Sequence, residues 1–225
     1  TYTWTFPAGW VQTAGGTTNS VTVTVGANAG NVTVTPSNIC GNSPPSTLAV
    51  TVSSLPAQTS AIAPVTPEVC QNSVQNYMVN PPAPVGVTYT WTGPAGSTIL
   101  SGQGTNLIQI RFGNTSGTLT ITPSNSCGNG PSQSMAITVI TSVPAQPGVI
   151  SGPVAPCTGT TQVYTVPLVS GLTYSWSVPA GWSITAGQGT NTISAVVGAS
   201  AGNIQVSAGN VCGGSAPRLL AVTPQ

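Results

Sequence analysis

Apolar and polar side chains alternate along short stretches of the chain. Ile108, Ile110 and Phe112 are separated by the polar residues Gln109 and Arg111. Because successive side chains of a strand point to opposite faces, this spacing predicts a half-buried β-strand. The same alternation occurs twice more, at Val21, Val23 and Val25 and at Ile193, Ala195 and Val197.

Further strands follow each of these stretches. A second apolar alternation comes next in each case, at Val32 and Val34, at Leu119 and Ile121, and at Ile204 and Val206. A last apolar run closes each set, at residues 48–52, 135–140 and 219–223. Each set has about seven short strands, which are bounded by Gly, Pro, Asn and Ser and show no helical periodicity. Such a pattern is typical of antiparallel sandwiches. The sequence therefore predicts an all-β fold.

The strand pattern belongs to an internal repeat. Tyr2, Tyr89 and Tyr174 lie 87 and 85 residues apart, and each is followed by a tryptophan two positions later and then by Pro-Ala-Gly. A period of this length matches a small domain rather than a solenoid unit. Trp4, Trp91 and Trp176 fit the buried tryptophan on the third strand of an Ig-like sandwich. With proline-containing linkers between the repeats, the sequence predicts three tandem domains, at residues 1–53, 54–141 and 142–225.

The first repeat is incomplete. Its residues contain no counterpart of the strands around Tyr77 and Tyr164, so the first two strands of its sandwich are absent. We expect the chain to be an excerpt of a longer tandem array, consistent with an N-terminal stretch that does not resemble a signal peptide. The alternative is donor-strand exchange, in which another chain fills the gap.

Charge is nearly absent and excludes several classes of function. Only Glu68, Arg111 and Arg218 carry a formal charge among 225 residues, and there is no histidine. Binding of nucleic acid or anionic membranes depends on several Lys or Arg residues, so neither is expected. Acid–base catalysis needs a positioned titratable group and calcium sites need several carboxylates, so we expect no enzyme, no metal site and no cofactor. No apolar run is long enough to suggest membrane insertion.

Five cysteines leave two pairing schemes open. Sequence spacing favours disulfides within domains, Cys70–Cys127 and Cys157–Cys212, with Cys40 unpaired. In an Ig-like topology, however, the start of the second strand and the end of the sixth lie at opposite ends of the domain, too far apart for a disulfide. We therefore favour an interdomain Cys70–Cys212 disulfide, with the other three cysteines paired to neighbouring domains outside this chain. Free reduced cysteines throughout remain a third alternative.

Two further tryptophans are candidates for a surface contact. Trp10 and Trp182 follow the Pro-Ala-Gly turn, where the middle repeat has Ser97. Since one repeat lacks it, this tryptophan is not required by the fold. Its ring is suited to stack on a sugar or a partner. The alternative is a structural role, covering a sheet edge or packing on a neighbouring domain.

The order of these motifs resembles a known family. The motifs begin with Val69-Cys70 or Pro156-Cys157 and continue with Tyr-x-Val, T-Y-T/S-W and Pro-Ala-Gly. The G-Q-G-T-N element follows, at 102–106 and 187–191, and then N-x-C-G. This order is similar to PKD-like repeats of large Bacteroidetes cell-surface proteins. The founding PKD pattern has W-D-F-G-D-G, whereas Trp4 is followed here by T-F-P-A-G. The resemblance implies tandem sandwiches exported to the bacterial surface, often by type IX secretion, in adhesins or gliding-associated filaments, and it places no catalytic residue in this chain.

Three functions follow as hypotheses. The first is a noncatalytic, rigid repeat stalk within a long extracellular adhesin or filament. The second is an array of carbohydrate-binding modules in a secreted protein. The third is a filament subunit that assembles by strand exchange. The expected partners are other surface proteins, further repeats of the same chain, or glycans.

Overall fold

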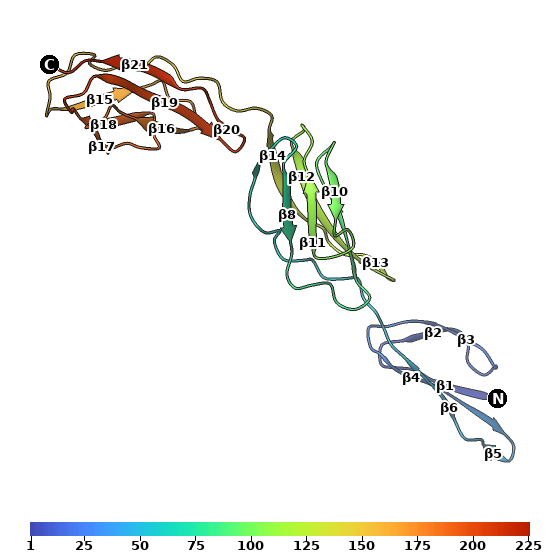
Figure 1. Ribbon diagram of the computed structural model, residues 1–225. Helices are drawn as coiled ribbons and strands as arrows, with labels where there is room; N and C mark the ends of the chain where they lie inside the picture. Colours follow the sequence, from blue (N-terminus) through green and yellow to red (C-terminus); the bar gives the residue numbers. More distant parts are fainter. The chain divides into compact units, whose positions relative to one another are not determined.

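The computed structural model describes residues 1–225 and divides the chain into two compact units. The N-terminal unit comprises Thr1–Pro56 together with Ser124–Asn129, and the C-terminal unit comprises Ala57–Pro123 and Gly130–Gln225. All regular elements are strands, coloured along the chain in Figure 1. No helix has the length and apolar character needed to cross a bilayer.

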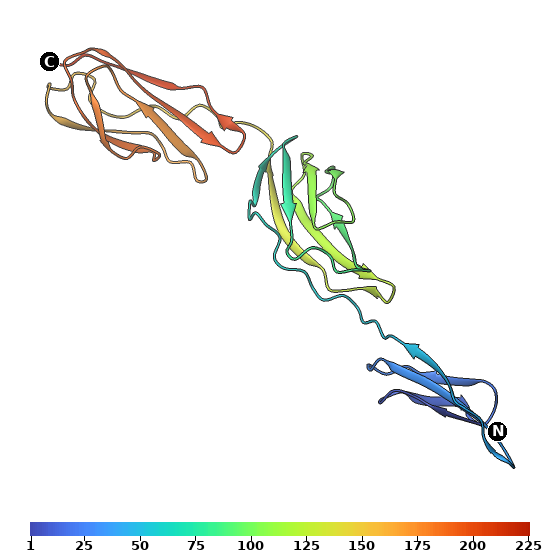
Figure 2. The ribbon, with the colours of Figure 1, turned by 60° about the horizontal axis from the view of Figure 1, so that its bottom comes forward.

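The N-terminal unit contains two small sheets. Strands β1 and β6 flank β4, which also forms a hairpin with the short β5, while β2 and β3 pair only with each other. Figure 2 shows these strands in blue. Their bounds are β1 Tyr2–Thr5, β2 Val11–Gly15, β3 Val21–Thr24, β4 Gly30–Asn38, β5 Gly41–Asn42 and β6 Ser46–Val50.

The next eight strands form the middle sandwich. One sheet has the order β10-β11-β8, and the other has the order β13-β12-β14-β7, with β9 also paired to β12. Strand β7 runs parallel to β14, whereas all other pairs with assigned register in this sandwich are antiparallel. The bounds are β7 Glu68–Cys70, β8 Val74–Met78, β9 Thr88–Thr92, β10 Thr98–Ser101, β11 Leu107–Arg111, β12 Gly117–Asn125, β13 Gly128–Asn129 and β14 Gln133–Ile140.

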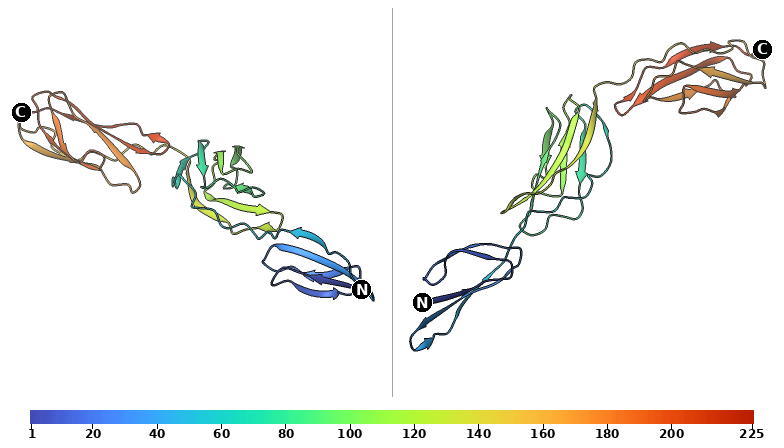
Figure 3. Two further views of the ribbon diagram at one scale, coloured as in Figure 1. Left: turned by 90° about the horizontal axis from the view of Figure 1, so that it is seen from below. Right: turned by 180° about the vertical axis from the view of Figure 1, so that it is seen from behind.

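The last seven strands form the third sandwich, whose two sheets are visible in orange and red in Figure 3. One sheet has the order β15-β18-β17, and the other has β16 and β21 on either side of β19, which also pairs with β20. The bounds are β15 Thr161–Thr165, β16 Thr173–Ser177, β17 Ser183–Ala186, β18 Thr192–Val196, β19 Gly202–Asn210, β20 Gly213–Gly214 and β21 Arg218–Val222. The all-β prediction of Ig-like sandwiches is confirmed, while the exact domain boundaries stay predictions.

The middle and third sandwiches each have their own core, built from the positions that the alternation marks as apolar. Ile108 and Ile110 are fully buried in the middle sandwich, and Ile193 and Ala195 in the third. Trp91 and Trp176 are buried as well, as predicted. Burial of such side chains away from water is the main force holding a sandwich together.

The N-terminal unit has no comparable core. None of its residues falls in the buried class, and Trp4 is only half-buried. The prediction of a buried Trp4 is therefore wrong for this unit. The physical reason is that no strand corresponding to β8 or β15 lies beside β3 to close the sandwich.

The last strand of each repeat extends only as far as a neighbouring strand pairs with it. In the middle sandwich β14 continues to Ile140 because Thr138–Ile140 pair with β7. In the N-terminal unit β6 stops at Val50, although the alternation predicted a strand to residue 52. A strand segment without a hydrogen-bonded neighbour is not stabilised as part of a sheet, which accounts for the shorter β6.

Alkaline pH is expected to destabilise both complete sandwiches. Burial raises the pKa of Tyr77 and that of Tyr164 above the usual value of 10.0. A raised folded-state pKa means that this stability is fully present below about pH 10 and is lost as the pH rises through the folded pKa values. Because the chain has no histidine, we expect no stability change between about pH 5 and 7. Urea unfolding followed by circular dichroism, with the free thiols alkylated, measures both effects.

The matched control for this prediction is Tyr164→Phe. It removes the titrating hydroxyl from the third sandwich and leaves Tyr77 in the middle one. We expect the alkaline loss of stability to shrink only for the transition of the third sandwich. A pH dependence that is unchanged in this variant contradicts the assignment to Tyr164.

Candidate functional site

The strongest candidate site is a hairpin that carries one cysteine at the end of each long strand. In all three copies an asparagine side chain accepts a hydrogen bond of 2.8 Å from the backbone N–H of the cysteine two residues later, at Asn38 and Cys40, Asn125 and Cys127, and Asn210 and Cys212. The glycine that follows has φ values of 131°, 128° and 129°, a region that side chains with a Cβ rarely adopt. The N-x-C-G motif therefore encodes a fixed turn that presents the cysteine.

The turn at Cys212 in the third sandwich is joined covalently to the middle sandwich. Cys70 and Cys212 form a disulfide with their Cα atoms 5.0 Å apart. The parallel pairing of β7 with β14 places Cys70 opposite Ile140, and the sulfur of Cys212 lies 3.2 Å from the carbonyl oxygen of Ile140. The Asn210 side chain also donates a hydrogen bond of 3.0 Å to the carbonyl of Ser142.

The second hairpin makes the same contacts within the N-terminal unit. The Cys127 thiol donates to the carbonyl of Ser53 at 3.3 Å, and the Asn125 side chain donates to the carbonyl of Ser54 at 2.6 Å. Ser53 follows β6, as Ile140 ends β14. Cys127 therefore occupies the same position beside the end of a last strand as Cys212 does, but without a bonded cysteine.

The bonded pair in the structure is the interdomain pair. Cys40, Cys127 and Cys157 are free and exposed. The pairing of Cys70 with Cys212 remains a proposal about the protein in solution, where non-reducing peptide mapping tests it directly. A crosslinked peptide joining Cys70 to Cys127 would refute it.

The structure corrects the surface-contact hypothesis for Trp182. This residue is only 7% exposed and belongs to the core of the third sandwich, where its ring lies 6.4 Å from that of Tyr164. Its indole N–H donates to the carbonyl of Ser200 at 3.0 Å. Trp10 makes the corresponding bond to Asn28 at 2.9 Å but is half-buried. Its surface role stays a hypothesis.

The glutamine of the G-Q-G-T-N element has a structural role that the sequence analysis missed. Gln103 accepts a hydrogen bond from the backbone N–H of Trp91 at 2.9 Å and donates to its carbonyl at 3.0 Å. Gln188 forms the same pair of bonds with Trp176. The first repeat has Gly16 at this position and lacks the bonds. The sequence signal that could have indicated this role is the recurrence of the glutamine in the G-Q-G-T-N element of both complete repeats.

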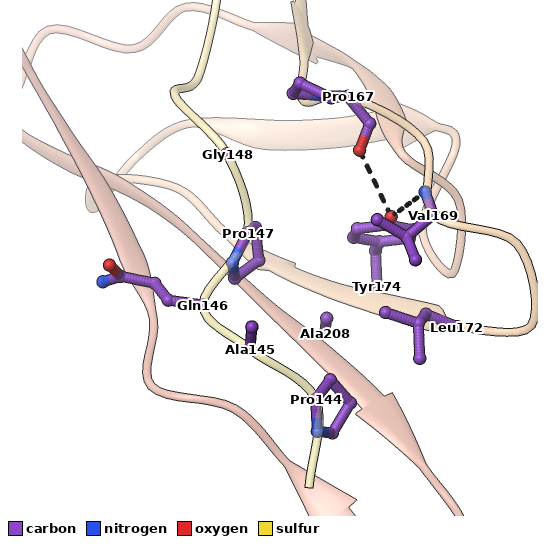
Figure 4. A pocket seen from close by; sticks show the side chains of 10 residues that line it. All are labelled: Pro144, Ala145, Gln146, Pro147, Gly148, Pro167, Val169, Leu172, Tyr174 and Ala208. Atoms are coloured by element: carbon purple, nitrogen blue, oxygen red, sulfur yellow. Dashed lines mark hydrogen bonds between the residues drawn. The ribbon is translucent and has the colours of Figure 1, made fainter.

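Residues of the third sandwich and of the linker before it line an apolar cavity of about 320 Å³, shown in Figure 4. Tyr174 lies at its wall, yet its hydroxyl accepts a hydrogen bond from the Val169 N–H at 2.8 Å and donates to the Pro167 carbonyl at 3.3 Å. Its side chain is 3% exposed. Tyr174 therefore offers no open ring face of the kind that stacks on a sugar.

The cysteine hairpins and the residues that face them hold the chain's sulfur groups. No group of three or more His, Cys, Asp or Glu side chains comes together. The disulfide and the three exposed thiols are the reactive groups that the fold positions. The thiolate is the reactive form of cysteine in disulfide exchange.

Two solved structures are reported as having a similar backbone trace. An I-band fragment of titin is 15% identical, with a TM-score of 0.45 over 100% of this chain and 88% of that chain. FdeC, an Escherichia coli adhesin, is 16% identical, with a TM-score of 0.40 over 100% of this chain and 85% of that chain. No curated protein matches the sequence.

A profile of the PKD-like domain matches three successive parts of the chain. The matched residues are 1–50, 55–137 and 143–222. They include the alternating strands, the Tyr-Trp pairs and the cysteine hairpins described above. The chain belongs to the PKD-like domain family.

Proposed function

We propose that the chain is a noncatalytic structural segment of a long bacterial cell-surface adhesin or filament, in which it acts as a rigid repeat stalk. The observation that supports this most is the Cys70–Cys212 disulfide between the middle and third sandwiches. Tandem domains joined by a flexible linker move relative to one another by default. A covalent bond at the junction restricts that motion.

Hydrogen bonds between the linker and the third sandwich support the same role. Arg218 donates to the carbonyl of Pro147 at 2.9 Å, and Gln146 donates to the carbonyl of Pro217 at 2.7 Å. Asn210 adds its bond to Ser142. The linker residues after β14 are therefore bonded to the third sandwich before and after the disulfide turn, which favours a stiff connection.

An extracellular, cell-surface location is part of the proposal. Disulfides persist mainly in oxidising compartments, and the Cys70–Cys212 bond supports such a setting. Export by type IX secretion and a part in gliding follow only from the family resemblance. The proposed partners are other surface proteins, further repeats of the same chain, or glycans.

The carbohydrate-binding alternative has less support. Such modules present aromatic rings on an open surface, but Trp182 and Tyr174 are buried. Trp10 is half-buried, so part of its side chain is accessible. Filament assembly by strand exchange is the third proposal, and it depends on the N-terminal unit rather than on the disulfide.

The stalk proposal is tested by small-angle X-ray scattering of the full chain. We expect the oxidised protein to scatter as a particle with a narrow range of interdomain geometries. Cys70→Ser is expected to broaden that range, because it removes the crosslink without touching a core. Cys157→Ser, which changes an exposed free thiol, is the matched control and leaves the scattering unchanged. If the oxidised protein is as flexible as Cys70→Ser, the rigid stalk is contradicted.

A further inference from the structure

We propose that the cavity beside Tyr174 binds a small uncharged apolar molecule. Linker residues 144–148 form one wall of the cavity, and residues of loop 167–172 form the other together with Tyr174 and Ala208 (Figure 4). All of these residues lie in the C-terminal unit. The inference is independent of the stalk role, which depends on the disulfide.

The volume of the cavity suits a ligand of this kind. It measures about 320 Å³, and small-molecule sites typically measure about 300–1,000 Å³. An apolar cavity of about 150 Å³ holds benzene. The cavity beside Tyr174 therefore has room for about two aromatic rings.

The lining of the cavity carries no charge. The chain's three charged side chains are those of Glu68, Arg111 and Arg218, and none of them lines the cavity. An ionised ligand would give up its hydration here without gaining an oppositely charged partner, which is strongly unfavourable. We therefore expect the ligand to be uncharged.

The two polar side chains of the lining are already hydrogen-bonded. The Tyr174 hydroxyl bonds to the Val169 N–H and the Pro167 carbonyl. The Gln146 amide donates to the carbonyl of Pro217 at 2.7 Å, and Figure 4 shows it pointing away from the other lining side chains. The rest of the lining consists of Pro, Ala, Gly, Val and Leu. A sugar would leave hydroxyl groups unpaired here, whereas an apolar molecule would not.

The linker wall is fixed by contacts with the third sandwich. Arg218 donates to the carbonyl of Pro147 at 2.9 Å. The next residue, Gly148, approaches Pro167 so closely that an added Cβ would lie 2.9 Å from the proline Cδ. Because a side chain at this position would clash, a glycine is needed for the approach. The wall is therefore formed before a ligand binds, as is usual for small-molecule sites.

Apolar side chains at the cavity remain partly in water. Val169 is 54% exposed, and Leu172 is only half-buried. The cavity is therefore open to solvent on the side of loop 167–172, so a ligand can enter without unfolding of the sandwich. A bound apolar molecule would cover both side chains, and that burial favours binding.

The middle sandwich has more atoms at the equivalent place. Loop 80–88 of the middle repeat has nine residues, whereas the equivalent loop 167–173 has seven. Ala83, in the longer loop, packs against the core of the middle sandwich. The middle repeat also has Pro123 where the third repeat has the smaller Ala208. Both differences remove atoms from the third sandwich at the place where the cavity lies.

The test titrates the full chain with naphthalene and with 1-naphthalenesulfonate, which has the same two rings and a negative charge. We expect naphthalene to shift the methyl NMR signals of Val169 and Leu172, which line the cavity. Its dissociation constant is expected to be at least about tenfold lower than that of the sulfonate, because the lining offers no partner for a charge. Unshifted methyl signals, or equal dissociation constants for the two probes, would overturn the proposal.

Ala208→Leu is expected to fill part of the cavity and to weaken naphthalene binding by at least about tenfold, because the ligand and the added atoms need the same space. Ala221→Leu adds the same atoms at an exposed position of β21. It is the matched control and is expected to leave binding unchanged.

A second pair of variants avoids any change in the core. Val169→Ser removes apolar surface from the mouth of the cavity and is expected to weaken binding by at least about threefold. Val154→Ser is the matched control, because Val154 is also 54% exposed but does not line the cavity. Unchanged binding in a folded Ala208→Leu or Val169→Ser variant contradicts the proposal and leaves the stalk proposal untouched.

Discussion

Reduction of the Cys70–Cys212 disulfide is expected to add about 480 Å to the chain length released when the protein is pulled from its two ends. The two cysteines are 142 residues apart in sequence, and an extended chain spans about 3.3–3.6 Å per residue. In the oxidised protein the force passes through the sulfur atoms, so the chain between them is not extended. Single-molecule pulling with and without a reductant measures the difference.

The same measurement distinguishes the two pairing schemes. Disulfides within domains would enclose only the 57 residues from Cys70 to Cys127 and the 55 residues from Cys157 to Cys212. Reduction would then release two lengths of about 190 Å each. Cys70→Ser should behave as the reduced protein, and Cys157→Ser as the oxidised one. An equal released length with and without reductant excludes both schemes.

Trp182→Ala is expected to destabilise the third sandwich by about 3–5 kcal/mol, the usual range for truncating a buried aromatic side chain. The side chain is 7% exposed, contacts Tyr164 and donates a hydrogen bond to Ser200. Trp10→Ala removes the same side chain from a half-buried position and is the matched control, with a much smaller expected cost. Urea unfolding of the full chain compares the two variants.

The middle sandwich suggests how the loss of Trp182 is offset. It has Ser97 where the third sandwich has Trp182, and Phe112 where the third has Val197. Phe112 packs edge-on against Tyr77 with ring centroids 6.1 Å apart. We expect Trp182→Ser combined with Val197→Phe to recover part of the stability lost in Trp182→Ser alone. Purely additive effects would show that the two positions do not share one space.

Much of the fold follows from side-chain alternation. Ile108 and Ile110 are buried because every second residue of a strand faces the core, and this periodicity can be read in the sequence. The buried state of Trp91 and Trp176 follows from the repeat in the same way. Trp4 carries the same local pattern but stays half-buried, because burial depends on a covering strand that the local sequence does not contain.

The candidate site was harder to predict because its contacts cross between repeats. The turn at Cys212 follows from Asn210 and Gly213, which are local to the motif. Its position beside Ile140 depends on the order of strands in the preceding sandwich, which spacing alone does not determine. Trp182 was open to two interpretations for a similar reason. Its ring packs near that of Tyr164, which lies on β15 and is distant in sequence.

The disulfide also changes how the protein responds to proteases that cut after basic residues. The chain has only two such positions, Arg111 in β11 and Arg218 at the start of β21. A cut after Arg111 falls between Cys70 and Cys212, so the two fragments stay linked through sulfur. A cut after Arg218 lies beyond both cysteines, in β21, and does not fall between the middle and third sandwiches. Such a protease can nick this protein but cannot separate its middle and third sandwiches while the bond is intact.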